Sequence, residues 1–515
     1  MWFKPSAILT VAVAATVSAS PAELSDTVCV GITCAIAAAT AQDVAVTRHV
    51  YTTNPASMQD FLAFTISSFG VNGRLSDADE AETVQKGRGE RIVDIAASSY
   101  MKLSPSATVW GDARFSTGQR RHIEWNNAAD YDLVAPYVTG DSVGGNLSTR
   151  QYSFMGGYAG SSRGWGWGAE AAYTATIDYR DRDPRDKIIV SDLRIKAGGT
   201  RSIGKSYTIG VAGRLRIYNQ ESDVEFYNPN NDIHLYPLTG LGNFYPRFSS
   251  ISGMNTSYKG IGTGGSLQLL PASRRGAIVN ADFRYISMRQ ILRDFNNLEL
   301  TRGDTYTLYA TAGWLGKAGA VSYGVMADLG LSRRLGYENV FGSSVGNNYL
   351  TIGTRRNYLH DRLTGRLTVP LTVSFREAMT LDINPGATFV YDKESYRKPR
   401  RELSAQAITP ALDLRFRKRF GRRWMLTVGC GANHRFASEK VRNLKGLDLS
   451  SSLGKSVVAN FDMLTAGRTC VHALAGADIA IGAKMALGIS ASYRHTAYRN
   501  HGAAQRAEVN INLKF

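Results

Sequence analysis

Acidic and basic residues recur two positions apart along this sequence of 515 residues. Asp112 precedes Arg114 and Asp282 precedes Arg284, with one residue between each acid and its arginine. Side chains two positions apart lie on the same face of a β-strand, so these pairs would set opposite charges side by side along one face. Rings of charged side chains can select ions in a pore. The chemistry that these residues first indicate is therefore the binding or passage of small charged solutes.

A larger set of charges fits the same pattern. Its acids lie close to predicted short turns and would form a belt in one half of the structure, and several of its arginines follow an acid by two positions. The sequence leaves two interpretations open: the belt marks the path of a solute, or the charges neutralise one another in a packed or wet interior and bind nothing specific. The candidates are Asp112, Arg114, Glu170, Arg214, Arg216, Asp282, Arg284, Asp328, Arg366, Asp382, Asp413, Arg415, Asp478 and Arg494.

Histidine and cysteine offer little catalytic or metal-binding chemistry here. A general acid or base must lie within hydrogen-bonding reach of its partner, and of the eight histidines only His472 is predicted to share the charged face within a strand. His434 and His495 lie at alternate positions that place them on the opposite face of their strands. We expect no Ser–His or Asp–His constellation whose members lie at the same depth in the barrel. Cys430 and Cys470 fall on opposite faces, and two thiols make no metal site. We expect no enzyme, no catalytic residue, no cofactor and no metal.

The elements that must position these charges are β-strands. Within residues 165–177, Trp165, Trp167 and Tyr173 lie on one face of an alternating segment, and Glu170 lies on the other. Such alternation over about ten residues, with aromatic residues at the interface, is typical of a strand that crosses a membrane within a barrel. The same period continues in 207–217, 277–285, 306–314 and 321–331.

The connections alternate between tight turns and long polar loops, as expected of a barrel with short periplasmic turns and long external loops. The tight turns are 104–106, 161–164, 271–276, 316–319 and 482–484, and the long loops are 120–149, 219–256, 333–348 and 437–467. The chain closes with the alternating segment 507–515, which ends on an aromatic residue and resembles the last strand that the barrel-assembly machinery recognises.

These patterns predict an all-β chain, a transmembrane antiparallel up-and-down β-barrel. Strands counted from residue 91 onward number about seventeen, and because a bacterial barrel closes with an even number of strands, one more is placed at 60–72, with 73–90 as the first external loop. The expected count is therefore about 18 strands, within 16 to 20. After the first forty residues, no apolar run approaches the roughly 20 residues of a membrane helix.

The amino terminus has the features of a secretory signal. Lys4 precedes an apolar run, Ala7 to Ala19, and a later run of small residues ends at Ala41. We expect a signal peptide at 1–41, a short periplasmic segment at 42–59, which is too short for a folded plug domain, and a barrel at 60–515. The predicted location is the outer membrane of a Gram-negative bacterium.

Two of the long loops are rich in aromatic residues. Such residues could form a constriction in the mouth of the barrel or a surface on which a ligand stacks, or the loops could pack on one another as a lid. The sequence leaves both interpretations open. The residues are Phe226, Tyr227, Tyr236, Phe244, Tyr245 and Phe248 in loop 219–256, and Trp125, Tyr131 and Tyr137 in loop 120–149.

The net charge of +17 at neutral pH could favour anionic partners, but its distribution argues against nucleic acid. The basic residues are spread over both strand faces, the turns and the loops instead of forming one patch. The glycine-rich stretch 260–265 is followed by a continuing strand pattern and not by a helix, so it is not a phosphate-binding loop. Glycine there relieves crowding and allows a barrel to curve.

Several short motifs resemble a family of outer-membrane barrels of unknown function from Bacteroides-like bacteria. They are Trp110-Gly111-Asp112-Ala113-Arg114-Phe115, Trp125-Asn126, Asp130-Tyr131, Ala135-Pro136-Tyr137 and Asp141-Ser142-Val143-Gly144-Gly145, and the likeness covers nearly the whole mature chain. The resemblance implies a barrel and a location but no activity and no site residues. Asn54-Pro55-Ala56 is also loosely similar to long-chain fatty-acid transporter barrels, whose N-terminal segment enters the lumen.

Two functions follow from this sequence. The first is a channel or uptake pore for small solutes, with a charged lumen. The second is a structural or accessory barrel that serves a neighbouring outer-membrane receptor and transports nothing itself. The expected partners are outer-membrane lipid and lipopolysaccharide, the barrel-assembly machinery, and a small anionic solute or a receptor.

Overall fold

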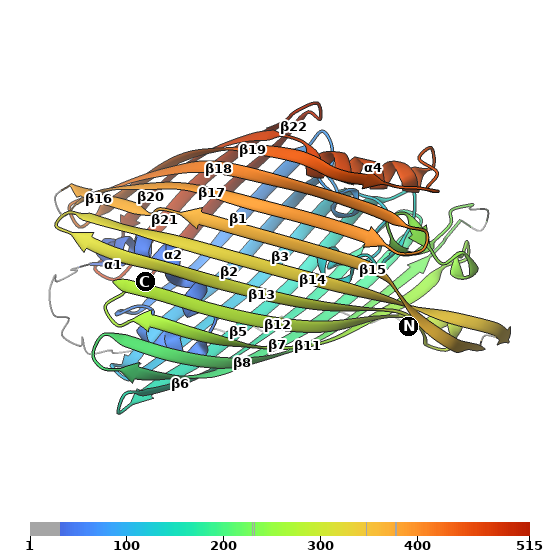
Figure 1. Ribbon diagram of the computed structural model, residues 1–515. Helices are drawn as coiled ribbons and strands as arrows, with labels where there is room; N and C mark the ends of the chain where they lie inside the picture. Colours follow the sequence, from blue (N-terminus) through green and yellow to red (C-terminus); the bar gives the residue numbers. More distant parts are fainter. Residues whose placement is uncertain (1–30, 229, 231, 347, 376–377) are drawn as a thin grey trace, which may run out of the picture.

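Figure 1 shows the computed structural model of the chain, which describes residues 31–515 apart from 229, 231, 347, 376 and 377. Long strands run obliquely around a closed cylinder, and the first helices lie within one of its ends. Within these described ranges, no helix combines the length and the apolar character that a membrane crossing requires. Of the predicted signal peptide, residues 1–30 lie outside the described part of the chain.

The wall consists of long antiparallel strands joined in chain order. They are β1 (Ile66–Ala78), β2 (Gly89–Ser104), β3 (Ala107–Ile123), β5 (Gly145–Ser162), β6 (Trp165–Tyr179), β7 (Arg185–Ile203), β8 (Tyr207–Glu225), β11 (Met254–Pro271), β12 (Gly276–Leu292), β13 (Leu298–Ala318), β14 (Val321–Val345), β15 (Asn348–Thr368), β16 (Leu371–Phe375), β17 (Met379–Tyr396), β18 (Arg401–Phe420), β19 (Trp424–Asn443), β20 (Arg468–Ala480), β21 (Ala486–Tyr498) and β22 (Ala503–Lys514).

The remaining elements lie inside or above this wall. They are the helices α1 (Ile32–Ala39), α2 (Gln42–Tyr51), α3 (Tyr131–Val134) and α4 (Ser452–Thr465), the short 3-10 helices η1 (Pro55–Asp60), η2 (Val84–Lys86), η3 (Pro246–Phe248) and η4 (Arg293–Phe295), and a small sheet of β4 (Thr139–Gly140), β9 (Tyr236–Gly240) and β10 (Asn243–Phe244).

The cylinder closes because β1 pairs with both β2 and β22, with Gly73 opposite Val509 at the seam. β15 and β16 both lie between β14 and β17 and count as one strand. Pro370 separates them, and proline has no N–H for the ladder. The wall is thus a closed antiparallel barrel of 18 strands, which confirms the predicted fold class and strand count.

The two ends of the barrel differ. At one end, which we call the turn end, the strands are joined by the predicted tight turns at 104–106, 161–164, 271–276, 316–319 and 482–484. The other end, the loop end, carries the segments 124–144, 226–253 and 444–467. Three of the long loops are therefore where the sequence predicts them, although their strands extend further than expected.

Two predicted boundaries are wrong. The first strand spans Ile66–Ala78 and not 60–72, because Phe61 and Leu62 are buried inside the barrel with the N-terminal residues. The expected loop at 333–348 is largely strand, since the ladder between β14 and β15 continues to the pair Val345 and Asn348. This long hairpin projects beyond the wall at the loop end.

The outer face of the wall is apolar in its central part. On β8, Ile209, Val211, Leu215 and Ile217 point outward with 39 to 56% of their surface exposed. Such a band, flanked by aromatic residues, suits contact with lipid. The side chains on the alternate positions face the interior.

Candidate functional site

The seven acids and seven arginines predicted to line the lumen all lie on the inner face of the wall. This face is identified by Trp110 and Asp328, which contact N-terminal residues inside the barrel. In the same strand, residues separated from these two by an even number of positions point to the same face. Residues paired across neighbouring strands also share a face, so the inner face of every strand can be identified in turn. Their part in binding a solute stays a prediction.

On the wall formed by β6, β7 and β8, the inward acids are held in ion pairs. Glu170 pairs with Lys196 at 2.7 Å, and Asp192 accepts hydrogen bonds from Arg216 through both carboxylate oxygens at 2.8 and 3.1 Å. Asp192 and Lys196 were not predicted from the sequence. The inner face of β7 begins with apolar residues that are buried at the loop end, so β7 shows no clear alternation.

A second cluster joins β8 to β12 across β11. Asp282 lies 2.6 Å from a terminal nitrogen of Arg214 and 2.6 Å from one of Arg284. Gly264 of β11 leaves room for the side chain of Arg214 to reach Asp282. A Cβ at this position would lie 3.1 Å from Cδ of Arg214 and 2.3 Å from the carbonyl oxygen of Phe283. The carboxylate is buried and neutralised by the two guanidinium groups.

Four inward arginines, one each on β3, β15, β18 and β21, have no such partner. Arg114, Arg366, Arg415 and Arg494 are exposed to the interior, and no carboxylate of the described residues lies within 4.0 Å of their guanidinium nitrogens. Arg366 stands opposite Asp328 in the strand register, but that acid binds the N-terminal segment. These four arginines, which we call the free arginines, are positive charges on the inner face that no described carboxylate neutralises at contact distance. The inward Asp112, two positions before Arg114, likewise has no described cation within 4.0 Å.

The structure brings together Asp–His pairs that the sequence analysis did not expect. Nε2 of His472 lies 3.0 Å from Asp413, across the intervening strand β19. Gly431 of that strand leaves room for this contact, because a Cβ there would lie 2.3 Å from Oδ1 of Asp413 and 2.5 Å from Cε1 of His472. A pair that spans a third strand cannot be seen from the spacing of residues along the chain.

Residues 32–64, which we call the inner segment, lie inside the turn end of the barrel (Figure 1). Val44, Val50, Tyr51 and Met58 of this segment form a buried core with wall residues that include Trp110, Leu270, Ile278, Leu315 and Met326. The core joins strands on several sides of the barrel. Residues 42–59, predicted as a short segment ahead of the barrel, thus lie within its turn end.

Asn54 anchors this segment in a socket made by the wall. Its side-chain amide donates to the carbonyl oxygens of Gly199 and Val211 at 3.1 and 3.4 Å, and its Oδ1 accepts from the backbone N–H of Ala56 at 3.0 Å. A Cβ at Gly198 would lie 2.1 Å from Oδ1 of Asn54. A Cβ at Gly168 would lie 2.6 Å from the backbone nitrogen of Ala56, and one at Gly210 would lie 2.7 Å from Nδ2 of Asn54, so three adjacent strands leave room for this turn.

Polar contacts hold the rest of the inner segment. Tyr100 donates from its hydroxyl to the carbonyl oxygen of Met58 at 2.7 Å, and Ser57 donates to Gln268 at 2.9 Å. His49 lies 3.3 Å from Asp328. The contacts come from β2, β11 and β14, so the segment touches the wall at well-separated strands.

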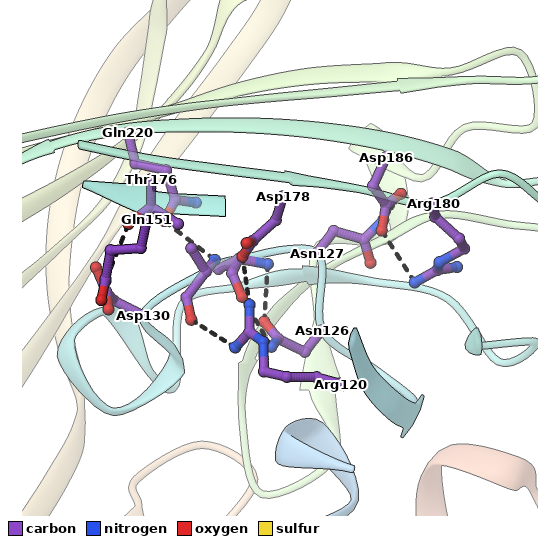
Figure 2. Close-up of polar contacts among 12 residues, drawn as sticks. Arg120, Asn126, Asn127, Asp130, Gln151, Thr176, Asp178, Arg180, Asp186 and Gln220 are labelled. Carbon is purple, nitrogen blue, oxygen red and sulfur yellow. Dashed lines mark hydrogen bonds and ion pairs between the residues drawn. The ribbon is translucent and has the colours of Figure 1, made fainter. Parts of the chain in front are cut away.

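The loop end is closed by segment 124–144, which packs on wall residues in the mouth. Figure 2 shows its Asn127 beside Asp186 of β7. Arg180 is sandwiched between Asp141 of this segment, at 3.1 Å, and Asp186 of β7, at 2.9 Å, and all three side chains are at most 1% exposed. Burial alone would lower the pKa of Arg180, but the two carboxylates raise it above its ordinary value. Asn127 adds a hydrogen bond to Asp186 at 2.8 Å.

The same segment also contacts β14 and β15, which four other strands separate from β7. Arg334 of β14 donates to the carbonyl oxygen of Asp132 at 2.7 Å and also to that of Ala135. Tyr137 packs on Tyr358 of β15, with ring centroids 6.3 Å apart. The segment therefore crosses the mouth, and we call it, with segment 226–253, the lid.

The aromatic residues of the loops pack on one another and on the wall. Tyr236 contacts both Trp125 and Phe244, and β4 pairs with β9 to join the two lid segments. Phe248 is 1% exposed at the centre of a second aromatic cluster. Of the two interpretations left open by the sequence, the structure favours a packed lid.

Small cavities remain beside both closures. One of about 330 Å³ lies between the inner segment and the wall and is lined by Gln42, Arg274, Thr372 and Arg417 among others. One of about 130 Å³ lies under the lid beside Leu238, Glu394 and Phe461. Among the described residues, no group of three or more His, Cys, Asp and Glu side chains could hold a metal ion.

A model described as "Family of unknown function (DUF6850)" matches residues 55–515. The chain belongs to this family. The match covers β1 to β22 and η1, so the fold described above is that of a DUF6850 member, and the predicted membership in a family of unknown function is confirmed. No curated protein matches the sequence significantly.

Solved structures resemble this DUF6850 member in fold. The ferric preacinetobactin receptor BauA of Acinetobacter baumannii is 11% identical, with a TM-score of 0.41 over 88% of this chain and 79% of that one. The ferric enterobactin receptor PfeA of Pseudomonas aeruginosa is 7% identical, with a TM-score of 0.39 over 90% and 84%. The monoaromatic hydrocarbon channel CymD is 11% identical, with a TM-score of 0.32 over 90% and 91%. At this identity the likeness extends to the fold alone.

Proposed function

We propose that this chain is an outer-membrane channel for small anionic solutes, held closed by the inner segment and the lid. The observation that carries the proposal is the contrast between the two walls of the interior. The acids of β6 to β12 are neutralised in ion pairs, whereas the free arginines are not. An interior with unpaired positive charge attracts anions and repels cations.

The outer membrane is the location that best suits the surface. A closed barrel leaves no strand edge unpaired, as a lipid environment requires, and the exposed apolar residues lie on its outer face. A Gram-negative source and export by a signal peptide cleaved after Ala41 belong to the same proposal. N-terminal sequencing of the membrane-extracted protein should then begin at Gln42, which would remove α1 from the inner segment.

Conductance in planar lipid bilayers tests the channel directly. We expect brief, rare openings for the intact protein and a large, steady conductance for a variant that lacks residues 42–63 and also carries Arg180→Ala, because the core at the turn end and the buried charges that fix the lid are then both absent. Deletion-variant barrels that insert, migrate as folded species and conduct no current at all would contradict the channel.

Ion selectivity tests the role of the free arginines. In a salt gradient the open variant should prefer anions, and neutralising Arg366, Arg415 and Arg494 to glutamine should move its reversal potential toward zero. The matched control neutralises the outward-facing cations Arg91, Arg150 and Lys187, which removes the same charge from the outside of the wall. Equal shifts in both triple variants would refute selection by the interior.

Labelling of whole cells with an impermeant thiol reagent tests which end of the barrel faces the outside of the cell. A cysteine at Ser450 probes the loop end, and one at Ser106 probes the turn end; both positions are exposed. Gly240 is unsuitable as a probe, because a side chain there would lie 2.8 Å from the ring of Tyr358. We expect label at Ser450 alone, and label at Ser106 alone would invert the orientation.

Closure at both ends favours one alternative, an accessory barrel that conducts nothing and supports a neighbouring receptor. The bilayer experiment separates the two functions, since an accessory barrel has no reason to conduct selectively once its inner segment is removed. We expect no catalytic activity under either function.

A further inference from the structure

Three cations stand directly opposite one another on the outer face of the wall near the loop end. In the strand register Lys259 of β11 faces Arg289 of β12, and Arg289 faces Arg302 of β13. Directly opposed residues of an antiparallel sheet have Cβ atoms about 5 Å apart, and like charges in such positions destabilise the pairing. We call these three residues the outer cation row.

The row lies just beyond the apolar part of the outer surface. Ile261, on the same face as Lys259, is 59% exposed, and Phe283, on the same face as Arg289, is 46% exposed. Tyr285 and Tyr306 form an aromatic pair, with centroids 5.0 Å apart, four residues before Arg289 and four residues after Arg302. At a strand rise of about 3.4 Å per residue in a tilted strand, the row lies about 10 Å above the aromatic pair.

The protein neutralises this row incompletely. Arg289 has Glu299 at 3.6 Å, and Arg302 has Asp304 at 3.4 Å, both longer than a close charge-assisted hydrogen bond. Lys259 stands opposite Asn219 and Arg289, and none of the described carboxylates lies within 4.0 Å of its ammonium group. All three side chains are exposed, and the guanidinium group of Arg302 also lies over the ring of Tyr337, 4.7 Å from its centroid.

We infer that the outer cation row binds the phosphate group of a lipid headgroup, and specifically of lipopolysaccharide in the outer leaflet. The inference rests on the outer-membrane placement proposed above, with the loop end outside, but not on the channel. Two guanidinium groups offer planar, paired donors that suit phosphate oxygens, and Lys259 adds a point charge. The aromatic pair places the row at the depth where lipid headgroups begin.

The test compares the wild type with the triple variant K259Q/R289Q/R302Q in binding to purified lipopolysaccharide in detergent micelles. Each cation near an anionic membrane surface contributes about 1 kcal/mol, or about fivefold in affinity, so the triple variant should bind about a hundredfold more weakly. The matched control is R201Q/K205Q/K418Q, which removes three cations at the turn end and should bind like the wild type. Heat-modifiable migration verifies that all three proteins are folded.

Two further probes identify the ligand. Phosphatidylcholine micelles should not compete, and inorganic phosphate should compete only at far higher concentration than lipopolysaccharide. The site is refuted if the triple variant and the control bind lipopolysaccharide equally, and a lipid ligand is refuted if inorganic phosphate displaces lipopolysaccharide at matched concentration. Conductance of the triple variant should equal that of the wild type, so failure of the channel proposal would be seen separately.

Discussion

The two ends of the barrel are closed by different kinds of contact. At the loop end, the lid is fixed by buried charges, with Arg180 between two carboxylates that are fully buried. At the turn end, the inner segment is fixed mainly by an apolar core and by hydrogen bonds such as those of Asn54 and Tyr100. Its contact with a wall carboxylate, His49 with Asp328, is partly exposed. Removing one partner of a buried ion pair lowers the free energy of unfolding by more than removing a neutral hydrogen bond does. The turn end is therefore the closure that can open at lower cost.

The largest expected effect follows from removing the central charge of the lid. Arg180→Ala leaves Asp141 and Asp186 buried together without their cation, which should destabilise the lid by about 3 to 5 kcal/mol. Hydrogen exchange of backbone amides 125–141 should rise sharply while exchange of the wall stays slow. Arg185→Ala is the control: its pair with Asp183 is partly exposed and is worth less than about 1 kcal/mol. Similar exchange in both variants would show that the lid does not depend on the buried pair.

An intermediate effect is expected at the socket of the inner segment. Gly198→Ala places a Cβ 2.1 Å from Oδ1 of Asn54 and should expel that side chain, at a cost of about 1 to 3 kcal/mol for the lost buried hydrogen bonds. The opening frequency in bilayers should rise. The control is Gly199→Ala, where the Cβ would meet its nearest atom, the carbonyl oxygen of Gly166, at 3.6 Å. If both variants have the same opening frequency, the socket does not hold the inner segment in place.

The smallest effects compare one tyrosine hydroxyl at each end. Tyr100→Phe removes a 2.7 Å hydrogen bond to Met58, and Tyr245→Phe removes a 2.8 Å hydrogen bond to Asn339. Each should cost about 1 kcal/mol. Hydrogen exchange should increase only around residues 55–62 in the first variant and only around the lid in the second. Increased exchange at both ends in either variant would mean that the closures are coupled.

The sequence predicts the wall far better than its contents. Trp165 and Glu170 reveal their faces because one side of a membrane strand must be apolar and the other can be polar. That rule fails where the interior is itself apolar: Ile188 and Val190 of β7 face inward and are buried beneath the lid. The ion pair of Asp192, two positions further along, was missed for that reason.

The inner segment could be predicted only in part. Asn54-Pro55-Ala56 resembles a motif of barrels whose N-terminal segment enters the lumen, yet its socket comes from glycines more than a hundred residues away. The Asp413–His472 pair likewise depends on Gly431 of a third strand. Such contacts follow from strand register, and a single sequence fixes register only through the turns.

The inner segment also constrains the order in which the barrel is assembled. Residues 42–64 precede every strand of the wall in the chain, but the ring that surrounds them is complete only when β22, the last strand in the chain, pairs with β1. The socket of Asn54 is made by β6, β7 and β8 and is available long before that final pairing. We expect the segment to dock on these three strands before β22 pairs with β1, so that the last seam closes around a segment that is already in place.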